Sequence, residues 1–265
     1  MRRVHGIRHS NIAATALAVL LFAAASAGEA RLARAAETFD HGPWSTILER
    51  YVDDDGRVAY RDLAARDGAT LDAYLAALAT ADPGGWTRDE QLAFWINAYN
   101  ALIFRAVLDG HSAESLFGRY RMFWRYRRVV AGAERTPDDI ENRIIRPMGE
   151  SRIHFALVCA SASCPKLLRR AWRAATLEAD LDAQTRRFVN DPARNRIAPG
   201  APALGLSAIF DWYDEDFGGS DDALRAYVAR FSDEPSRAYL TEQRPEVEFL
   251  DYDWSLNAQP GQRPE

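Results

Sequence analysis

One stretch of the chain, residues 90–108, is apolar on nearly every side when drawn as a helix, and it constrains the fold most. Apolar residues recur at helical spacing, and further apolar residues fill the opposite side: Leu92, Trp95, Ile96, Tyr99, Leu102, Ile103 and Ala106, then Ala93, Phe94, Ala98 and Phe104. A helix that is apolar all round is buried all round. The stretch therefore predicts a central helix that other elements must cover.

Two asparagines, Asn97 and Asn100, are three residues apart and share one face of this predicted helix. A buried amide without a partner costs about 1–3 kcal/mol, so both side chains must find hydrogen bonds. Two interpretations are open at this point. The asparagines either tie down neighbouring loops or line a polar site.

The rest of the chain alternates between helical and extended patterns. Thr136 is a natural N-cap and Pro137 suits a first helical position, so a helix is expected to begin there. Further helices are predicted at residues 71–79, from Cys164 and Pro165 onward, and at 177–189 and 222–231, while residues 207–217 are predicted to be a turn or a short helix. Extended structure is predicted as a hairpin at 51–60, a core strand at 152–159 and a half-exposed strand at 246–252. Together these patterns predict a helix-rich α+β domain around a small, mainly antiparallel sheet.

The N-terminus has the pattern of a cleavable signal peptide. Arg2, Arg3 and Arg8 precede a run of about fourteen mostly apolar residues, 12–25, which is shorter than the roughly twenty that a spanning helix needs. Cleavage is expected after Ala27, or as late as residue 35. An exported protein, periplasmic or secreted, with no stable membrane span after cleavage is therefore predicted.

Charge excludes one class of partner. The whole chain has a formal charge of -5, and removal of residues 1–27 takes away three arginines and no acid, which leaves -8. Nucleic-acid binding depends on clustered Lys and Arg, so no nucleic-acid partner is expected. Without an internal repeat or a long linker, residues 38–257 are predicted to form a single domain, followed by a disordered tail at 258–265.

The two cysteines, Cys159 and Cys164, lie close together in the chain, and in an exported protein a disulfide is the first hypothesis. The second is a thiol nucleophile, with Cys164 at a helix start and His154 as the base. In a regular strand, however, His154 and Cys159 would point to opposite faces. The spacing is a poor zinc motif and no second ligand pair exists, so neither a metal nor a cofactor is expected.

An acidic and aromatic stretch at residues 210–217 allows two further interpretations. Its carboxylates could form a glycosidase pair in an aromatic cleft, or they could be a solvated face over an aromatic anchor. The residues concerned are Asp211, Asp214, Glu215 and Asp216, among Phe210, Trp212, Tyr213 and Phe217. Spacing alone does not fix the separation that such a pair needs.

Four ordered motifs resemble the domain-of-unknown-function family 547. They are Leu92 to Leu102, the Asp139-Ile140-Glu141 triplet, Ile153 to Ser161 with Ser163-Cys164-Pro165, and Leu206-Ser207 with 210–213 and 252–257. The resemblance implies a single domain, found in exported bacterial proteins and in some plant proteins, with no established activity. The family usually has His where this chain has Asn142, and some branches have another residue at Cys164, which shifts weight toward Cys159.

Two functions are predicted from these features. The first is a thiol-dependent hydrolase or acyl transferase acting on a peptide-like or small substrate in the cell envelope. Cys164 or Cys159 would be its nucleophile, with His154 as base and Glu141 in support. The alternative is a non-catalytic, disulfide-closed binding module for a peptide or glycan. In either case the substrate-binding residues are expected to be Asn97, Asn100, Trp95 and Trp212.

Overall fold

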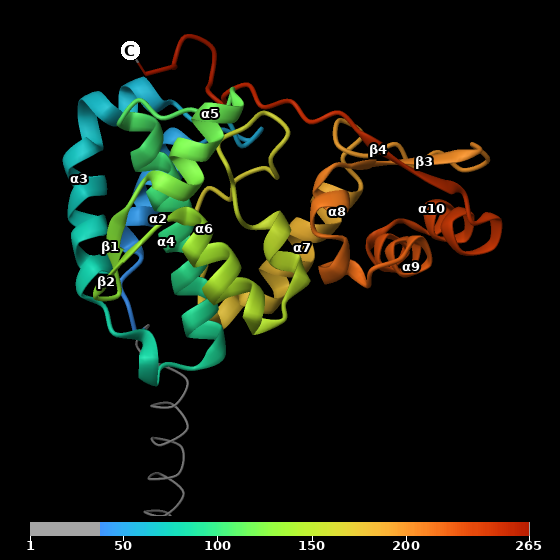
Figure 1. The fold of residues 1–265 in the computed structure, drawn as a ribbon, viewed down its shortest axis with the longest axis horizontal. Coiled ribbons are helices and arrows are strands. Elements are labelled where there is room, and N and C mark those ends of the chain that lie inside the picture. The colour runs from blue at the N-terminus through green and yellow to red at the C-terminus, as the bar shows by residue number, and fades with distance from the viewer. Residues whose placement is uncertain (1–37, 265) are drawn as a thin grey trace, which may run out of the picture. The chain divides into compact units, whose positions relative to one another are not determined.

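A computed structural model describes residues 38–264 of the chain. The described residues from Phe39 onward form one compact unit (Figure 1). The predicted signal peptide, residues 1–27, lies outside the described residues and stays a prediction.

Helices make up most of this unit. They are α2 (Gly42–Tyr51), α3 (Tyr60–Thr80), α4 (Arg88–Leu108), α5 (Leu116–Arg119), α6 (Pro137–Ile140), α7 (Leu177–Val189), α8 (Ile209–Trp212), α9 (Asp221–Phe231) and α10 (Glu234–Ala238). Helix α5 continues as a π-helical segment over Tyr120–Arg125, and α6 continues likewise over Glu141–Ile145; Ser151–Phe155 and Asp214–Phe217 are 3-10 turns. No helix among the described residues is long and apolar enough to span a bilayer.

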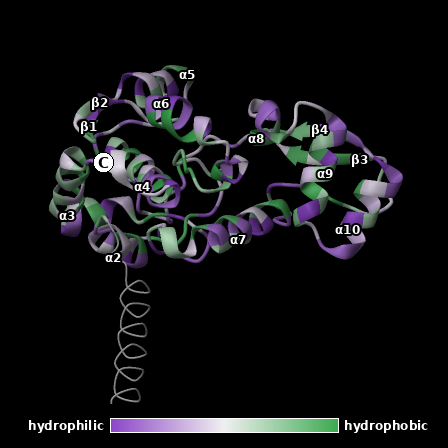
Figure 2. Cartoon of the chain, turned by 90° about the horizontal axis from the view of Figure 1, so that it is seen from below, coloured by the Kyte–Doolittle hydropathy of each residue, from purple (hydrophilic) through white to green (hydrophobic). Residues whose placement is uncertain are grey.

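Helix α4 is the buried helix that the sequence predicts. Thr87 caps it by accepting a hydrogen bond from the Glu90 backbone N–H, while the Glu90 carboxylate accepts from the Thr87 backbone N–H. Helix α3 packs against α4 and also against α2, and the three lie together in Figure 1. Helix α7 forms over the predicted residues and shows both hydrophilic and hydrophobic colours in Figure 2, as expected for a helix with one buried face.

The strands form two separate pairs. Strands β1 (Arg128–Val130) and β2 (Ala133–Arg135) are antiparallel, whereas β3 (Ala203–Ser207) and β4 (Glu246–Leu250) are parallel. The helix-rich α+β class is thus confirmed, and β4 occupies most of the predicted strand at 246–252. The pairs are not one sheet in the centre of the molecule, because α4 fills that place.

The predicted hairpin at residues 51–60 is a tight turn between α2 and α3. Val52 pairs antiparallel with Val58, and Gly56 lies at a φ of 76°. A Cβ atom at this glycine would come within 2.7 Å of the Leu167 backbone nitrogen. Glycine is therefore needed here both for its backbone conformation and for space.

The sequence predicts a core strand at residues 152–159, and this prediction is wrong. The segment begins as a 3-10 turn and continues as irregular chain. Asn100 explains the difference: its Nδ2 donates to the Ala156 carbonyl at 3.0 Å, and its Oδ1 accepts from the Val158 N–H at 2.9 Å. A single buried amide thus satisfies backbone groups that a neighbouring strand would otherwise have paired.

The helix predicted to begin at Cys164 and Pro165 is also absent, and helical structure resumes only at Ala174. The intervening loop is held by side chains of other elements. Asn97 bonds both the N–H and the carbonyl of Trp172, and Gln184 donates to the Lys166 carbonyl. With these partners, the loop satisfies its backbone without a helix, and Cys164 has no helix dipole behind it.

Residues 258–264, predicted from the sequence as a disordered tail, are bonded to the start of the unit. Ala258 forms a bridge with Val58, and the Gln259 N–H donates to the Val58 carbonyl at 3.0 Å. The Gln259 side chain also donates to the Tyr51 carbonyl at 3.2 Å. Polar composition suggested disorder, but these backbone bonds depend on pairing with residues that are distant in sequence.

The apolar core has two clusters. The larger surrounds α4, and the smaller is built around Phe210 with residues of α7, α9 and β3. Ile153 and Val158 belong to the larger cluster, while Phe155 belongs to the smaller one. The segment 153–158 therefore runs between the two clusters.

Candidate functional site

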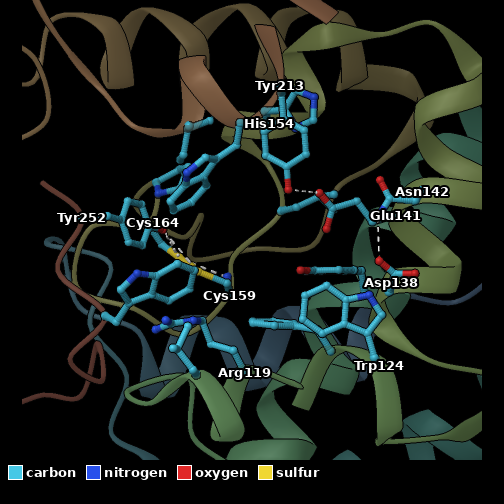
Figure 3. Close-up of a pocket in the computed structure, with 18 residues that line it drawn as sticks. Arg119, Trp124, Asp138, Glu141, Asn142, His154, Cys159, Cys164, Tyr213 and Tyr252 are labelled. Atoms are coloured by element: carbon cyan, nitrogen blue, oxygen red, sulfur yellow. Dashed lines mark hydrogen bonds between the residues drawn. A yellow bond between two sulfur atoms is a disulfide. The ribbon is translucent and has the colours of Figure 1, made fainter. Parts of the chain in front are cut away.

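A cavity of about 420 Å³ opens along this segment. It is lined by Tyr99, Leu116, Arg119, Phe123, Trp124, Asp138, Glu141, Asn142, His154, Leu157, Cys159, Cys164, Pro165, Ile209, Trp212, Tyr213, Tyr252 and Trp254. Figure 3 shows Tyr213 and His154 on one side, with Arg119 and Trp124 opposite them. Aromatic walls with a few polar groups are typical of small-ligand sites.

Three aromatic rings form a cluster in one wall. The Trp212 and Trp254 rings are nearly parallel with centroids 5.4 Å apart, and Tyr252 lies 4.8 Å from Trp212 and 4.6 Å from Trp254. The Arg119 guanidinium sits 4.3 Å over the Trp254 ring. Trp212 is 44% exposed, so a large part of this aromatic cluster remains available to a ligand.

The carboxylate of Glu141 lies in the opposite part of the cavity. It is nearly buried, and the Tyr213 hydroxyl donates to its Oε1 at 2.5 Å. Burial raises the pKa of Glu141, although hydrogen bonds from Tyr213 and Tyr99 pull it down in part. A buried acid with a raised pKa is a frequent feature of functional sites.

His154 is held by Asp216, one of the carboxylates of the acidic and aromatic stretch at residues 210–217. Its Nε2 lies 2.7 Å from Asp216 Oδ2, and its ring stacks on Tyr213 with centroids 3.8 Å apart. Burial lowers the pKa of His154 to about 4, although Asp216 acts in the opposite direction. The imidazole is therefore neutral at neutral pH.

Arg146 connects the His154–Asp216 pair to the acidic part of the cavity. Its guanidinium donates to both carboxylate oxygens of Asp216, at 2.7 and 3.1 Å, and to the side-chain amide oxygen Oδ1 of Asn142 at 3.0 Å. Asn142 in turn donates to Asp138 at 2.8 Å. Burial alone would raise the pKa of Asp216, but the hydrogen bonds from Arg146 and His154 lower it.

The two cysteine sulfurs lie at disulfide distance in the cavity wall, with their Cα atoms 6.4 Å apart (Figure 3). The Tyr252 hydroxyl is 3.3 Å from each sulfur, and Cys159 Sγ is 3.1 Å from the Ser161 hydroxyl. Among residues 38–264, His154 forms no hydrogen bond to either sulfur. The structure thus brings the predicted nucleophiles and base to one cavity, but in separate groups.

Three of the four predicted substrate-binding residues lie away from the cavity. The Asn97 and Asn100 side chains bond backbone groups of two loops. Of the two interpretations of these asparagines, the structure therefore agrees with the one in which they tie down neighbouring loops. Trp95 is buried against Phe94, and the Arg135 guanidinium lies 5.3 Å from its ring. Trp212 alone of the four lines the cavity.

Several contributors to the cavity were missed at the sequence level. The acidic and aromatic stretch at residues 210–217 contained the signal, because Asp216 binds His154 and Tyr213 binds Glu141. No comparable signal marked Arg146 or Arg119. In the part of the chain that the structure describes, no group of three or more His, Cys, Asp or Glu side chains is arranged to hold a metal ion.

Comparison with known proteins places part of this cavity in a family. Residues 83–189 match the family described as protein of unknown function, DUF547. The similarity to this family is confined to that segment. The DUF547 segment contains Glu141, His154 and both cysteines, whereas Asp216 and the aromatic cluster lie beyond it. No curated protein and no solved structure matches the chain.

Proposed function

We propose that this DUF547 protein is a binding module that holds a glycan in the aromatic cavity. The observation that carries the proposal is the pairing of the cysteines at disulfide distance in a wall shared with three clustered aromatic rings. Paired sulfurs offer no thiolate, while an exposed aromatic face can pack against the C–H groups of a sugar ring. The N-terminal pattern favours a site of action in the cell envelope.

The polar groups of the cavity favour a sugar over a peptide. Asp138, Asn142 and Arg119 provide planar acceptors and donors around the apolar walls, and such groups suit the alternating hydroxyls of a sugar. Extended peptides are often bound along an unpaired strand edge. The cavity lining comes from helices, turns and irregular chain, and includes no residue of β1 to β4.

The test measures binding to glucose oligomers, N-acetylglucosamine oligomers and, in parallel, short peptides by isothermal titration. Trp212→Ala should weaken glycan binding at least about tenfold, which is about 1.4 kcal/mol. Phe249→Ala is the matched control, because Phe249 is similarly exposed at 41% but lies on β4 outside the cavity. Peptide binding without glycan binding, or equal losses in both variants, would refute the proposal.

A thiol-dependent hydrolase or acyl transferase is the second candidate. It is favoured by the presence of Cys159, His154 and Glu141 around one cavity. An external dithiol would first supply two electrons and two protons to separate the sulfurs. A cysteine thiolate would then attack an acyl carbon and expel the leaving group, which takes up a proton, and water would hydrolyse the resulting thioester.

The hydrolase is tested with aryl ester and thioester substrates, before and after treatment with dithiothreitol. Activity that appears only after reduction, and that Cys159→Ser or Cys164→Ser abolishes, would support this second candidate. Activity equal in the reduced and untreated protein would contradict a thiol mechanism. Glycan binding that survives reduction would neither support nor contradict the hydrolase, because glycan binding uses the aromatic rings whereas the hydrolase uses a cysteine thiolate.

A further inference from the structure

A short segment beside the cavity has a charge opposite to that of the rest of the protein. Residues 116–128, the arginine-aromatic segment, contain five arginines and no acidic residue, although the whole chain has a formal charge of -5. The segment comprises α5, its π-helical continuation and the start of β1. Figure 2 shows α5 at the margin of the molecule, beside α6.

The same segment exposes large apolar side chains. Leu116 is 79% exposed, Phe117 69%, and Tyr120 and Trp124 48% each. Together with Val129, they account for five of the seven large hydrophobic residues that are exposed among the described residues. Met122 and Tyr126 are buried beneath them and anchor the segment to the core. The exposed side chains thus project from a fixed support.

Most of the arginines of this segment lack an acidic partner. Arg121, Arg125 and Arg127 are exposed, and none forms a salt bridge with another of residues 38–264. Arg128 is paired with Asp109, and Arg119 lies over the Trp254 ring. The Arg127 charge helps to lower the pKa of Asp139. Arg121 and Arg125 therefore stand among exposed aromatic rings with their charges available.

We propose that the arginine-aromatic segment docks on the surface of a bilayer that contains anionic lipids. Tyrosine and tryptophan prefer the boundary between headgroups and acyl chains, and an exposed leucine and phenylalanine can enter the apolar side of that boundary. Each arginine near an anionic surface strengthens binding about fivefold. An acidic protein surface would satisfy the arginines but would leave Leu116 and Phe117 without an apolar environment.

Docking in this orientation has a consequence for the cavity. Leu116, Phe123 and Trp124 belong both to the segment and to the cavity lining. The mouth of the cavity beside these residues would therefore face the headgroup layer. A ligand displayed at the membrane surface would reach the cavity without passing through bulk solvent.

The experiment measures flotation of the protein with phosphatidylcholine vesicles, with and without about one third phosphatidylglycerol. Binding should require the anionic lipid and weaken as salt rises from 0.1 to 0.5 M, because screening shortens the range of the arginine charges. Arg121→Glu with Arg125→Glu should reduce the partition constant at least about 25-fold. Arg57→Glu with Arg61→Glu is the matched control, which makes the same charge change at exposed positions outside the segment.

A second variant separates insertion from charge. Phe117→Ser should lower the partition constant several-fold while leaving its salt dependence unchanged, because it removes an apolar group and no charge. Phe117 is exposed and does not line the cavity, so the variant should fold normally by circular dichroism.

Four outcomes would overturn the proposal. They are no flotation with anionic vesicles, equal losses in the control pair, a dimer that Phe117→Ser dissociates, and tighter binding to duplex DNA than to the vesicles. The vesicles contain no glycan, so failure of lipid docking would leave the proposed glycan site untouched.

Discussion

Replacing Asn100 by alanine should destabilise the protein by about 2–6 kcal/mol. The Asn100 side chain is 2% exposed, and it satisfies both the Ala156 carbonyl and the Val158 N–H. Each buried polar group left without a partner costs about 1–3 kcal/mol, and no neighbouring strand is present to replace the lost bonds. Asn100→Asp should be at least as harmful, because a carboxylate oxygen would face the Ala156 carbonyl.

Urea unfolding measures this loss. With a slope near 2 kcal/mol/M, the expected loss moves the midpoint down by about 1–3 M. Gln243→Ala is the control: Gln243 is an exposed amide side chain, and surface substitutions usually change the free energy of unfolding by less than about 0.5 kcal/mol. A loss below about 1 kcal/mol for Asn100→Ala would refute the idea that this amide replaces a strand neighbour.

Three further predictions concern the core, the histidine and the sulfurs. Trp95→Ala should lower the free energy of unfolding by about 3–5 kcal/mol in denaturant melts, as for other large core truncations. Because burial lowers the pKa of His154 from 6.5 to about 4, the unfolded state binds its proton first, and stability should fall as pH drops from 6.5 toward 4. The contribution of His154 to this loss is about 3 kcal/mol. In denaturant melts repeated between pH 6.5 and 4, the free energy of unfolding of the His154→Gln variant should therefore fall less steeply with pH than that of the native protein. An equal pH dependence in the two proteins would contradict the lowered pKa of His154. The native protein should show no thiol reactive toward Ellman's reagent, and two after reduction, because Cys159 and Cys164 lie at disulfide distance; two thiols before reduction would contradict the pairing.

Local rules were enough to predict several elements. Helix α4 follows from apolar residues on all its sides, and the cap at Thr136 forms as expected, with Asp139 accepting from the Thr136 N–H at 2.9 Å. Helix α7 coincides with the predicted residues 177–189. In each case the deciding signal lies within one helix, so distant contacts do not alter it.

Long-range partners explain the elements that were missed. The segment 152–159 has the composition of a strand, yet its backbone bonds go to an asparagine 56 to 58 residues earlier. The partner of His154 lies 62 residues away, in a stretch that also fits a solvated acidic face. Sequence patterns identified the asparagines as buried and polar, but they could not say which backbone groups the amides would satisfy.

The network around His154 explains why this histidine stays neutral despite its carboxylate partner. Asp216 would normally favour the imidazolium, but Arg146 binds both of its oxygens and compensates its charge. Burial of the ring is the largest cause of the lowered pKa of His154; Asp216 opposes it, and the Arg146 charge adds a smaller lowering. The network continues from Arg146 through Asn142 to Asp138. Asn142 has no titratable proton where the DUF547 resemblance leads one to expect a histidine. A neutral imidazole that stacks on Tyr213 and is bonded to Asp216 is suited to holding the cavity wall in place. We therefore expect His154 to keep Tyr213 in position in the cavity wall, which is the role that the proposed glycan-binding function requires of it.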